Sequence, residues 1–222
     1  MEYKFCMKTQ SSSAEDTWPA GSYCIYKKGD CPSGFVSGSI RWDDENSRNG
    51  NRAGGTLPDG TYDHNTVIFF CCRSDGVTSQ AISLPRGDFF YVALTLRQLS
   101  AGFATGQDTF IHWDDEDDDN ENTCGGVLPD GRYHVDTRIQ FCCRGDGVTS
   151  FGISLPTFNT FYLFALSSTC QEVDGMAVTP EWFRWDNENY DNVDLQSEEH
   201  PYEGIQSGGE NVRLTLCFYV PQ

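Results

Sequence analysis

Short runs of aromatic and β-branched residues, separated by turns rich in Gly, Pro and Asp, follow one another along the whole chain. Phe89–Leu94 and Phe161–Leu166 are two such runs. Runs of four to eight residues between turn signals are typical of β-strands. No stretch of ten or more residues combines the apolar spacing and the end signals of an amphipathic helix. The pattern therefore predicts an all-β protein.

One strand-and-turn unit returns along the chain. Phe70–Ser79 reappears with few changes as Phe141–Ser150. A strand that ends in tryptophan and acidic residues occurs three times, and its tryptophans, Trp42, Trp113 and Trp185, are 71 and 72 residues apart. The repeats extend approximately over residues 5–70, 71–141 and 142–217, which leaves no segment for a separate domain.

Each unit of about 70 residues has too few apolar residues to be stable alone. Packing the units around a shared axis buries their aromatic strands and removes exposed sheet edges. We therefore predict a single domain over residues 1–222 with three pseudo-symmetric repeats, similar to a β-prism or a β-trefoil. The alternative is a two-sheet β-sandwich.

The chain is strongly acidic, with a formal net charge of −18. Nucleic acid and anionic lipid surfaces repel such a protein, so neither is an expected partner. No apolar run approaches the roughly 20 residues that span a bilayer, so no membrane span is predicted. The first residues lack the basic and apolar regions of a signal peptide. That leaves a cytoplasmic location as the alternative to secretion.

The chain has ten cysteines, an even and high count that favours an oxidising compartment. Four of them form the adjacent pairs Cys71-Cys72 and Cys142-Cys143. Because neighbouring strand residues point to opposite faces, each pair must occupy two environments. We predict one disulfide, Cys24–Cys31, across a short hairpin.

The segments that follow the three tryptophans are dense in carboxylates and amides, which are candidates for ligand contact. These candidate residues are Asp43, Asp44, Glu45, Asn46, Asp114, Asp115, Glu116, Asp186, Asn187, Glu188, Asn189 and Tyr190. Asp115, Asp117 and Asp119 have the alternate spacing of the first EF-hand ligands, which makes Ca²⁺ a candidate cofactor. The alternative is a solvated turn whose side chains cap their own backbone.

Two roles are open to the tryptophans. Each follows an apolar strand residue at the same register, so we expect the three to form a core layer. The alternative is that they stack on sugar faces. The third loop, with Asn187 in place of an acid and Tyr190 inserted, is expected to differ most in specificity.

No nucleophile elbow, zinc-protease helix or phosphate loop is present in the sequence. A glycosidase pair of carboxylates is the remaining catalytic alternative. Repetition favours recognition instead, because three weak sites on one body gain avidity for a polymeric ligand. We therefore predict that the chain is not an enzyme.

The ordered string Trp18–Cys24, Gly29–Phe35 and Trp42–Glu45 resembles the signature of ApeC, the C-terminal domain of apextrin. The resemblance implies a secreted, invertebrate innate-immune protein that binds bacterial peptidoglycan or its muramyl dipeptide fragment and agglutinates bacteria. It supplies no catalytic residues. The alternative function is a non-catalytic interaction module: a matrix protein, an intracellular adaptor or an accessory domain of a pore-forming protein.

Overall fold

The computed structural model describes residues 17–44, 49–76, 90–94, 109–115, 120–144, 152–165, 167–187, 192–198, 200–206 and 211–222. Every regular element in these residues is a β-strand, so the all-β prediction is confirmed. No helix in this part of the chain is long and apolar enough to cross a membrane. The strands are β1 (Ser22–Tyr26), β2 (Val36–Trp42), β3 (Arg52–Gly54), β4 (Gly60–Tyr62), β5 (Thr66–Ser74), β6 (Phe90–Leu94), β7 (Thr109–Trp113), β8 (Thr123–Gly126), β9 (Gly131–Tyr133), β10 (Thr137–Arg144), β11 (Phe161–Ala165), β12 (Met176–Asp186), β13 (Leu195–Gln196), β14 (Glu203–Ile205) and β15 (Asn211–Pro221).

The strands fall into three groups of five with the same order of pairing. In each group a strand that ends near a tryptophan, here called a tryptophan strand (β2, β7 or β12), pairs antiparallel with a longer strand (β5, β10 or β15). The longer strand pairs on its other edge with an aromatic strand (β1, β6 or β11). We call β1–β5, β6–β10 and β11–β15 the first, second and third group.

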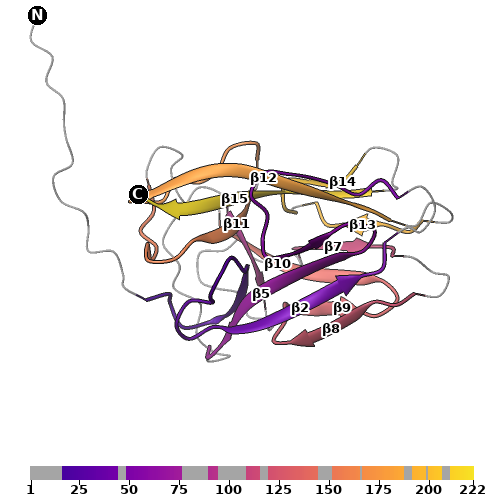
Figure 1. Ribbon diagram of the computed structural model, residues 1–222, viewed down its shortest axis with the longest axis horizontal. Helices are drawn as coiled ribbons and strands as arrows, with labels where there is room; N and C mark the ends of the chain where they lie inside the picture. Colours follow the sequence, from indigo (N-terminus) through magenta and orange to yellow (C-terminus); the bar gives the residue numbers. More distant parts are fainter. Residues whose placement is uncertain are drawn as a thin grey trace, which may run out of the picture.

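Hydrogen bonds also join the groups to one another. The aromatic strand β6 pairs with both β1 and β11. Each tryptophan strand uses its outer edge for a short strand of another group: β2 pairs with β8, β7 with β13, and β12 with β3. Antiparallel layers therefore face one another across the core, with β12 and β15 on one side and β2 and β5 on the other (Figure 1). This arrangement fits the sandwich alternative.

The tryptophans lie at the centre of the larger core cluster. Trp42, Trp113 and Trp185 have no exposed surface, and their ring centroids are 5.2–6.1 Å apart. Alternate residues of each tryptophan strand point inward, so an apolar layer of Ile40, Ile111 and Phe183 lies two residues before them. The prediction that the tryptophans form a core layer is confirmed.

Two disulfides use the adjacent cysteines of β5. Cys24 lies opposite Cys72 in the antiparallel pair of β1 and β5, with 4.1 Å between their Cα atoms, and the two are bonded. Cys71 points to the other face and is bonded to Cys31. The predicted Cys24–Cys31 bridge is therefore wrong, because the register of β1 and β5 brings a distant cysteine closer than the neighbouring hairpin does. The expectation of two environments for this pair is confirmed, since Cys72 and Cys71 belong to different core clusters.

A third disulfide joins Cys170 to Cys217 on β15. Cys124 is free and exposed on β8. The side chains of Cys142 and Cys143 lie outside the described part of the structure.

A tyrosine hydroxyl closes each Pro-x-x-x-Tyr turn. Tyr133 donates to the carbonyl of Pro129, 2.7 Å away, and equivalent bonds join Tyr62 to Pro58 and Tyr23 to Pro19. In the second group the turn also brings Gly131 close to the next strand, and a Cβ on Gly131 would lie 1.9 Å from the carbonyl oxygen of Arg138. Close backbone approach therefore requires glycine here.

Candidate functional site

The candidate site is the end of the three tryptophan strands. Two residues follow each tryptophan within the described part of the chain, and all six are buried. Their hydrogen bonds separate them into two sets. The first residue of each pair bonds to a segment of another group, and the second bonds within its own group. The first set is Asp43, Asp114 and Asp186, and the second is Asp44, Asp115 and Asn187.

The first set joins neighbouring groups through reciprocal hydrogen bonds, which we call clasps. In the second group, the backbone N–H of Asp114 donates to Asp194 Oδ1 at 2.7 Å. The N–H of Val193 donates back to Asp114 Oδ2 at 2.9 Å. Each clasp therefore fixes the end of a tryptophan strand to the segment just before a short strand of the next group.

The other two clasps have the same form. Asp43 N–H donates to Asn122 Oδ1 at 2.6 Å, and Glu121 N–H donates to Asp43 Oδ2 at 2.8 Å. Asp186 N–H donates to Asn51 Oδ1 at 2.7 Å, and Gly50 N–H donates to Asp186 Oδ2. The first group is thus clasped to the second, the second to the third, and the third to the first. The three clasps form a closed ring.

The second set, here called the axial residues, consists of Asp44, Asp115 and Asn187. Asp44 Oδ2 accepts from the hydroxyl of Thr66 at 2.6 Å and from Asn51 Nδ2 at 2.7 Å. Asp115 Oδ2 accepts from Thr137 at 2.7 Å and from Asn122 Nδ2 at 2.9 Å in the same way. Each axial carboxylate therefore has two donors on one oxygen.

In the third group, the acid and the amide stand at each other's positions. Asn187 replaces the axial acid, and Asp194 stands where the other groups have Asn51 and Asn122. Asn187 Nδ2 donates to Asp194 Oδ1 and Oδ2 at 3.2 and 3.1 Å. Val212, which lies opposite Trp185, replaces the threonine that lies opposite Trp42 or Trp113. The amide supplies its own donor, so no hydroxyl is needed.

One oxygen of every axial residue has no hydrogen-bond partner among the described residues. This oxygen is Oδ1 in Asp44, in Asp115 and in Asn187, and each residue is only 1% exposed. The indole N–H groups of the three tryptophans also have no partner in this part of the structure. A buried polar atom without a partner is costly, so these repeated exceptions require an explanation.

Burial changes the pKa of the carboxyl groups. Loss of solvent around the charged form raises the pKa of Asp44 to about 7, although its hydrogen bonds from Thr66 and Asn51 act in the opposite direction. Burial also raises the pKa of Asp115 well above its usual range, and the charge of Asp44 adds to this effect. In the third group, burial raises the pKa of Asp194 to about 6.

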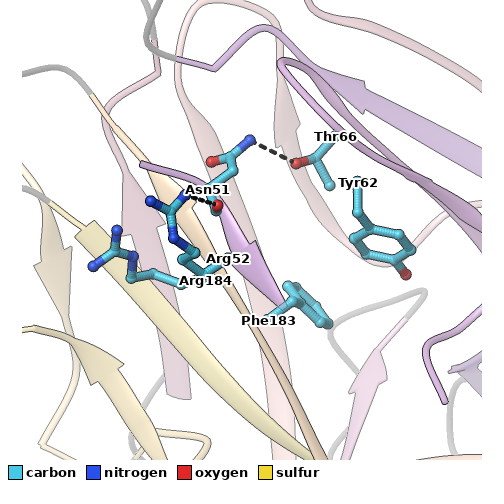
Figure 2. A pocket seen from close by; sticks show the side chains of 6 residues that line it. All are labelled: Asn51, Arg52, Tyr62, Thr66, Phe183 and Arg184. Carbon is cyan, nitrogen blue, oxygen red and sulfur yellow. Dashed lines mark hydrogen bonds between the residues drawn. The ribbon is translucent and has the colours of Figure 1, made fainter. Parts of the chain in front are cut away.

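A small cavity lies beside the clasp between the first and third groups (Figure 2). Its volume is about 10 Å³, which is room for about one water molecule. It is lined by Asn51, Arg52, Tyr62, Thr66, Phe183 and Arg184. This cavity is far too small for a sugar or a peptide.

The structure brings together six of the predicted site residues, namely the clasp acids and the axial residues. The other predicted residues, Glu45, Asn46, Glu116, Glu188, Asn189 and Tyr190, lie outside the described residues, as do Asp117 and Asp119 of the predicted calcium set. Asp115, the remaining member of that set, is buried and bonded to Thr137 and Asn122.

Sequence reasoning missed the partners of these residues. Asn51, Asn122 and Asp194 each link an axial residue of one group to a clasp of another. The signal was present as Asn-x-Asn/Asp at residues 49–51, 120–122 and 192–194, with the same 71- and 72-residue spacing as the tryptophans. In all three, the first Asn accepts from the backbone N–H two residues later at 2.9 Å.

Comparison with known proteins gives one family. Two segments of the chain, residues 1–101 and 99–219, match the model of the family ApeC, the C-terminal domain of apextrin. No curated protein and no solved structure matches the chain.

Proposed function

Because the chain belongs to the ApeC family, we propose that it is a secreted recognition protein that binds bacterial cell-wall material such as peptidoglycan or muramyl dipeptide. Binding several points of one polymer allows it to agglutinate bacteria. Family membership is the observation that carries this proposal. The geometry of the chain adds physical support.

We also propose that the three groups close into a ring with approximate three-fold symmetry, similar to a β-prism. The cyclic pairing of β2 with β8, β7 with β13 and β12 with β3 supports this closure, as do the three clasps. A ring of this kind presents three similar surfaces at one end of the molecule. Three weak contacts with a polymeric ligand then act together.

Secretion is supported by the disulfides. Three bridges occur in the described residues, and such bonds persist in oxidising compartments. Cys71 and Cys72 tie one strand to two different partners, which suits a protein that must remain folded outside the cell.

The net charge limits how this protein binds a bacterial wall. A charge of −18 is repelled at long range by wall carboxylates and phosphates. Binding must therefore use short-range contacts with neutral sugar and peptide parts, or a bridging cation. Val193 and Leu195 are exposed apolar side chains on either side of Asp194, at the clasp end of the molecule, and they supply such contacts.

Retention on insoluble peptidoglycan tests the proposal. The wild-type protein is incubated with peptidoglycan in Ca²⁺ and in EDTA, and cellulose serves as the control polymer. The variant Val193→Ser/Leu195→Ser should be retained severalfold less than the wild type. Phe158→Ser is the matched control. Phe158 is 71% exposed and precedes β11, whose first residue pairs near the far end of β15 from the clasps.

Three results would overturn parts of this proposal. Equal recovery on peptidoglycan and cellulose, with and without Ca²⁺, would exclude wall recognition and favour the protein-interaction alternative. Equal loss of binding in both variants would show that the clasp end is not the binding surface. Release of soluble fragments from the peptidoglycan would instead identify a hydrolase.

A further inference from the structure

The three unpartnered axial oxygens share one place in the fold. Each belongs to the residue two positions after a tryptophan, which lies just past the end of its strand, is buried and bonds within its own group. The indoles pack against one another, with centroids 5.2–6.1 Å apart. The axial residues therefore form the next layer along the same axis.

The hydrogen bonds of the axial residues hold their other atoms away from this centre. Donors from threonine and asparagine occupy Oδ2 of Asp44 and Oδ2 of Asp115. In the third group, the Nδ2 of Asn187 is occupied by Asp194. The exchange of Asp and Asn between positions 187 and 194 thus leaves an oxygen at the axis. Among the described residues, each group thus contributes one unpartnered side-chain oxygen to this layer, next to the layer of unpartnered indole N–H groups.

We propose that Asp44, Asp115 and Asn187 bind one hard divalent cation, of the Ca²⁺ type, through their Oδ1 atoms. Carboxylate and amide oxygens are the ligands that such ions prefer. When both are ionised, the carboxylates of Asp44 and Asp115 give the site a formal charge of −2, which a buried position disfavours unless a proton or a cation compensates it. Three protein oxygens are fewer than the six to eight that Ca²⁺ takes, so water completes the coordination shell.

This site differs from a calcium site formed by Asp115, Asp117 and Asp119. It takes one residue from each of the three groups, and it does not depend on the proposed recognition of cell walls. A bound ion would hold the ends of β2, β7 and β12 together, where the clasps meet.

Terbium luminescence tests the site directly, because Tb³⁺ replaces Ca²⁺ and is sensitised by nearby tryptophan. Metal-free protein is titrated with Tb³⁺ under excitation of the indoles, and Ca²⁺ and Mg²⁺ then compete. We expect saturable emission with one ion per chain, displaced by Ca²⁺. The same Ca²⁺ addition should raise the melting temperature.

Two charge-neutral exchange variants locate the ion. Asp115→Asn/Asn122→Asp and Asp44→Asn/Asn51→Asp copy the arrangement that Asn187 and Asp194 already have, so the bond between the two exchanged side chains is preserved while a carboxylate leaves the axis. The hydroxyl of Thr137 or Thr66 loses its carboxylate acceptor in these variants. We expect each variant to bind Tb³⁺ and Ca²⁺ about tenfold more weakly or worse, since carboxylate count sets affinity. Asp130→Asn removes one charge from the turn before β9 in the second group and should bind as the wild type does.

Circular dichroism and the melting temperature in EDTA show whether each exchange variant is folded, and the single variant Asp115→Asn repeats the test if an exchange variant does not fold. The proposal would be overturned if the wild type showed no saturable emission and no effect of Ca²⁺ on its melting temperature. Protons or water would then be the partners of the axial oxygens. Undiminished binding in a folded exchange variant or in Asp115→Asn would also overturn the proposal, because the ion would then lie elsewhere on this acidic chain.

Discussion

The clasp formed by Asp114 makes a quantitative prediction. Replacing Asp114 with alanine removes the carboxylate that accepts from the N–H of Val193 at 2.9 Å, and it leaves the backbone bond to Asp194 in place. A hydrogen bond to a charged group contributes about 1.5–3 kcal/mol. We therefore expect Asp114→Ala to lower the free energy of unfolding by about 2 kcal/mol.

A loss of about 2 kcal/mol corresponds to a fall of roughly 4–8 °C in the melting temperature of a domain of this size. Urea denaturation at pH 7, with the disulfides intact, measures the loss through the fluorescence of the buried tryptophans. Asp114→Asn keeps an acceptor oxygen without its charge and should lose about half as much. Asp130→Ala is the control, because no hydrogen bond to its side chain occurs among the described residues, and its effect should stay within about 0.5 kcal/mol.

The ring of clasps also predicts that its members are equivalent. Asp43→Ala and Asp186→Ala remove the same kind of bond at the other two junctions. Their losses should therefore agree with that of Asp114→Ala to within about 1 kcal/mol. A change of less than about 0.5 kcal/mol in Asp114→Ala would refute the reasoning, because it would mean that water replaces the clasp at no cost.

Three further outcomes follow from local geometry. Removing the Cys31–Cys71 bridge by double alanine substitution should cost about 2–3 kcal/mol in chain entropy, because the intact Cys24–Cys72 bridge leaves a closed path of only about eight residues; urea denaturation measures the loss, and a value below about 1 kcal/mol would contradict this. Burial lowers the pKa of His112 in the folded protein below the ordinary value of 6.5, so the unfolded chain binds the proton first and the free energy of unfolding falls as the pH drops through 6.5. His112→Gln should reduce this fall. Parallel curves of unfolding free energy against pH for the variant and the wild type would refute the prediction. Gly131→Ala forces a Cβ against the next strand and should cost about 1–3 kcal/mol, whereas Gly125→Ala meets no atom within 4 Å and should avoid this steric cost.

Sequence patterns were sufficient for the features that depend on local periodicity. Alternation of apolar residues and the 71- and 72-residue spacing predict the strands that carry Trp42, Trp113 and Trp185. They also predict the burial of these indoles. The same alternation, extended two residues past the strand ends, predicts which residue after each tryptophan continues the tryptophan face. A run of acids also resembles a solvated loop, so the sequence alone does not show that the alternation extends this far.

Features that depend on long-range register were beyond the sequence. Cys24 and Cys31 are close along the chain, but antiparallel pairing places Cys72 opposite Cys24. Likewise, the partners of the axial acids are seven residues away in sequence, and each also accepts a hydrogen bond from another group. A pattern within one repeat cannot show which neighbouring group provides that donor.

The exchanged pair in the third group allows the axial layer to be tested in the opposite direction. Asn187→Asp/Asp194→Asn gives this group the same side chains as the other two, so a third carboxylate joins Asp44 and Asp115. Val212 offers no hydroxyl in place of threonine, so the new carboxylate has one donor fewer than its counterparts, which costs about 1 kcal/mol. Repulsion between three buried carboxylates adds to that cost.

We therefore expect metal-free Asn187→Asp/Asp194→Asn to unfold at a lower urea concentration than the metal-free wild type at pH 8. Adding Val212→Thr should recover the part that the missing hydroxyl accounts for. Ca²⁺ should then stabilise the variant more than the wild type, because three carboxylates attract the ion more strongly than two. If the exchange leaves metal-free stability unchanged, the three axial side chains do not face one another, and the layer inferred from strand alternation would be wrong even though the tryptophans beneath it are packed together.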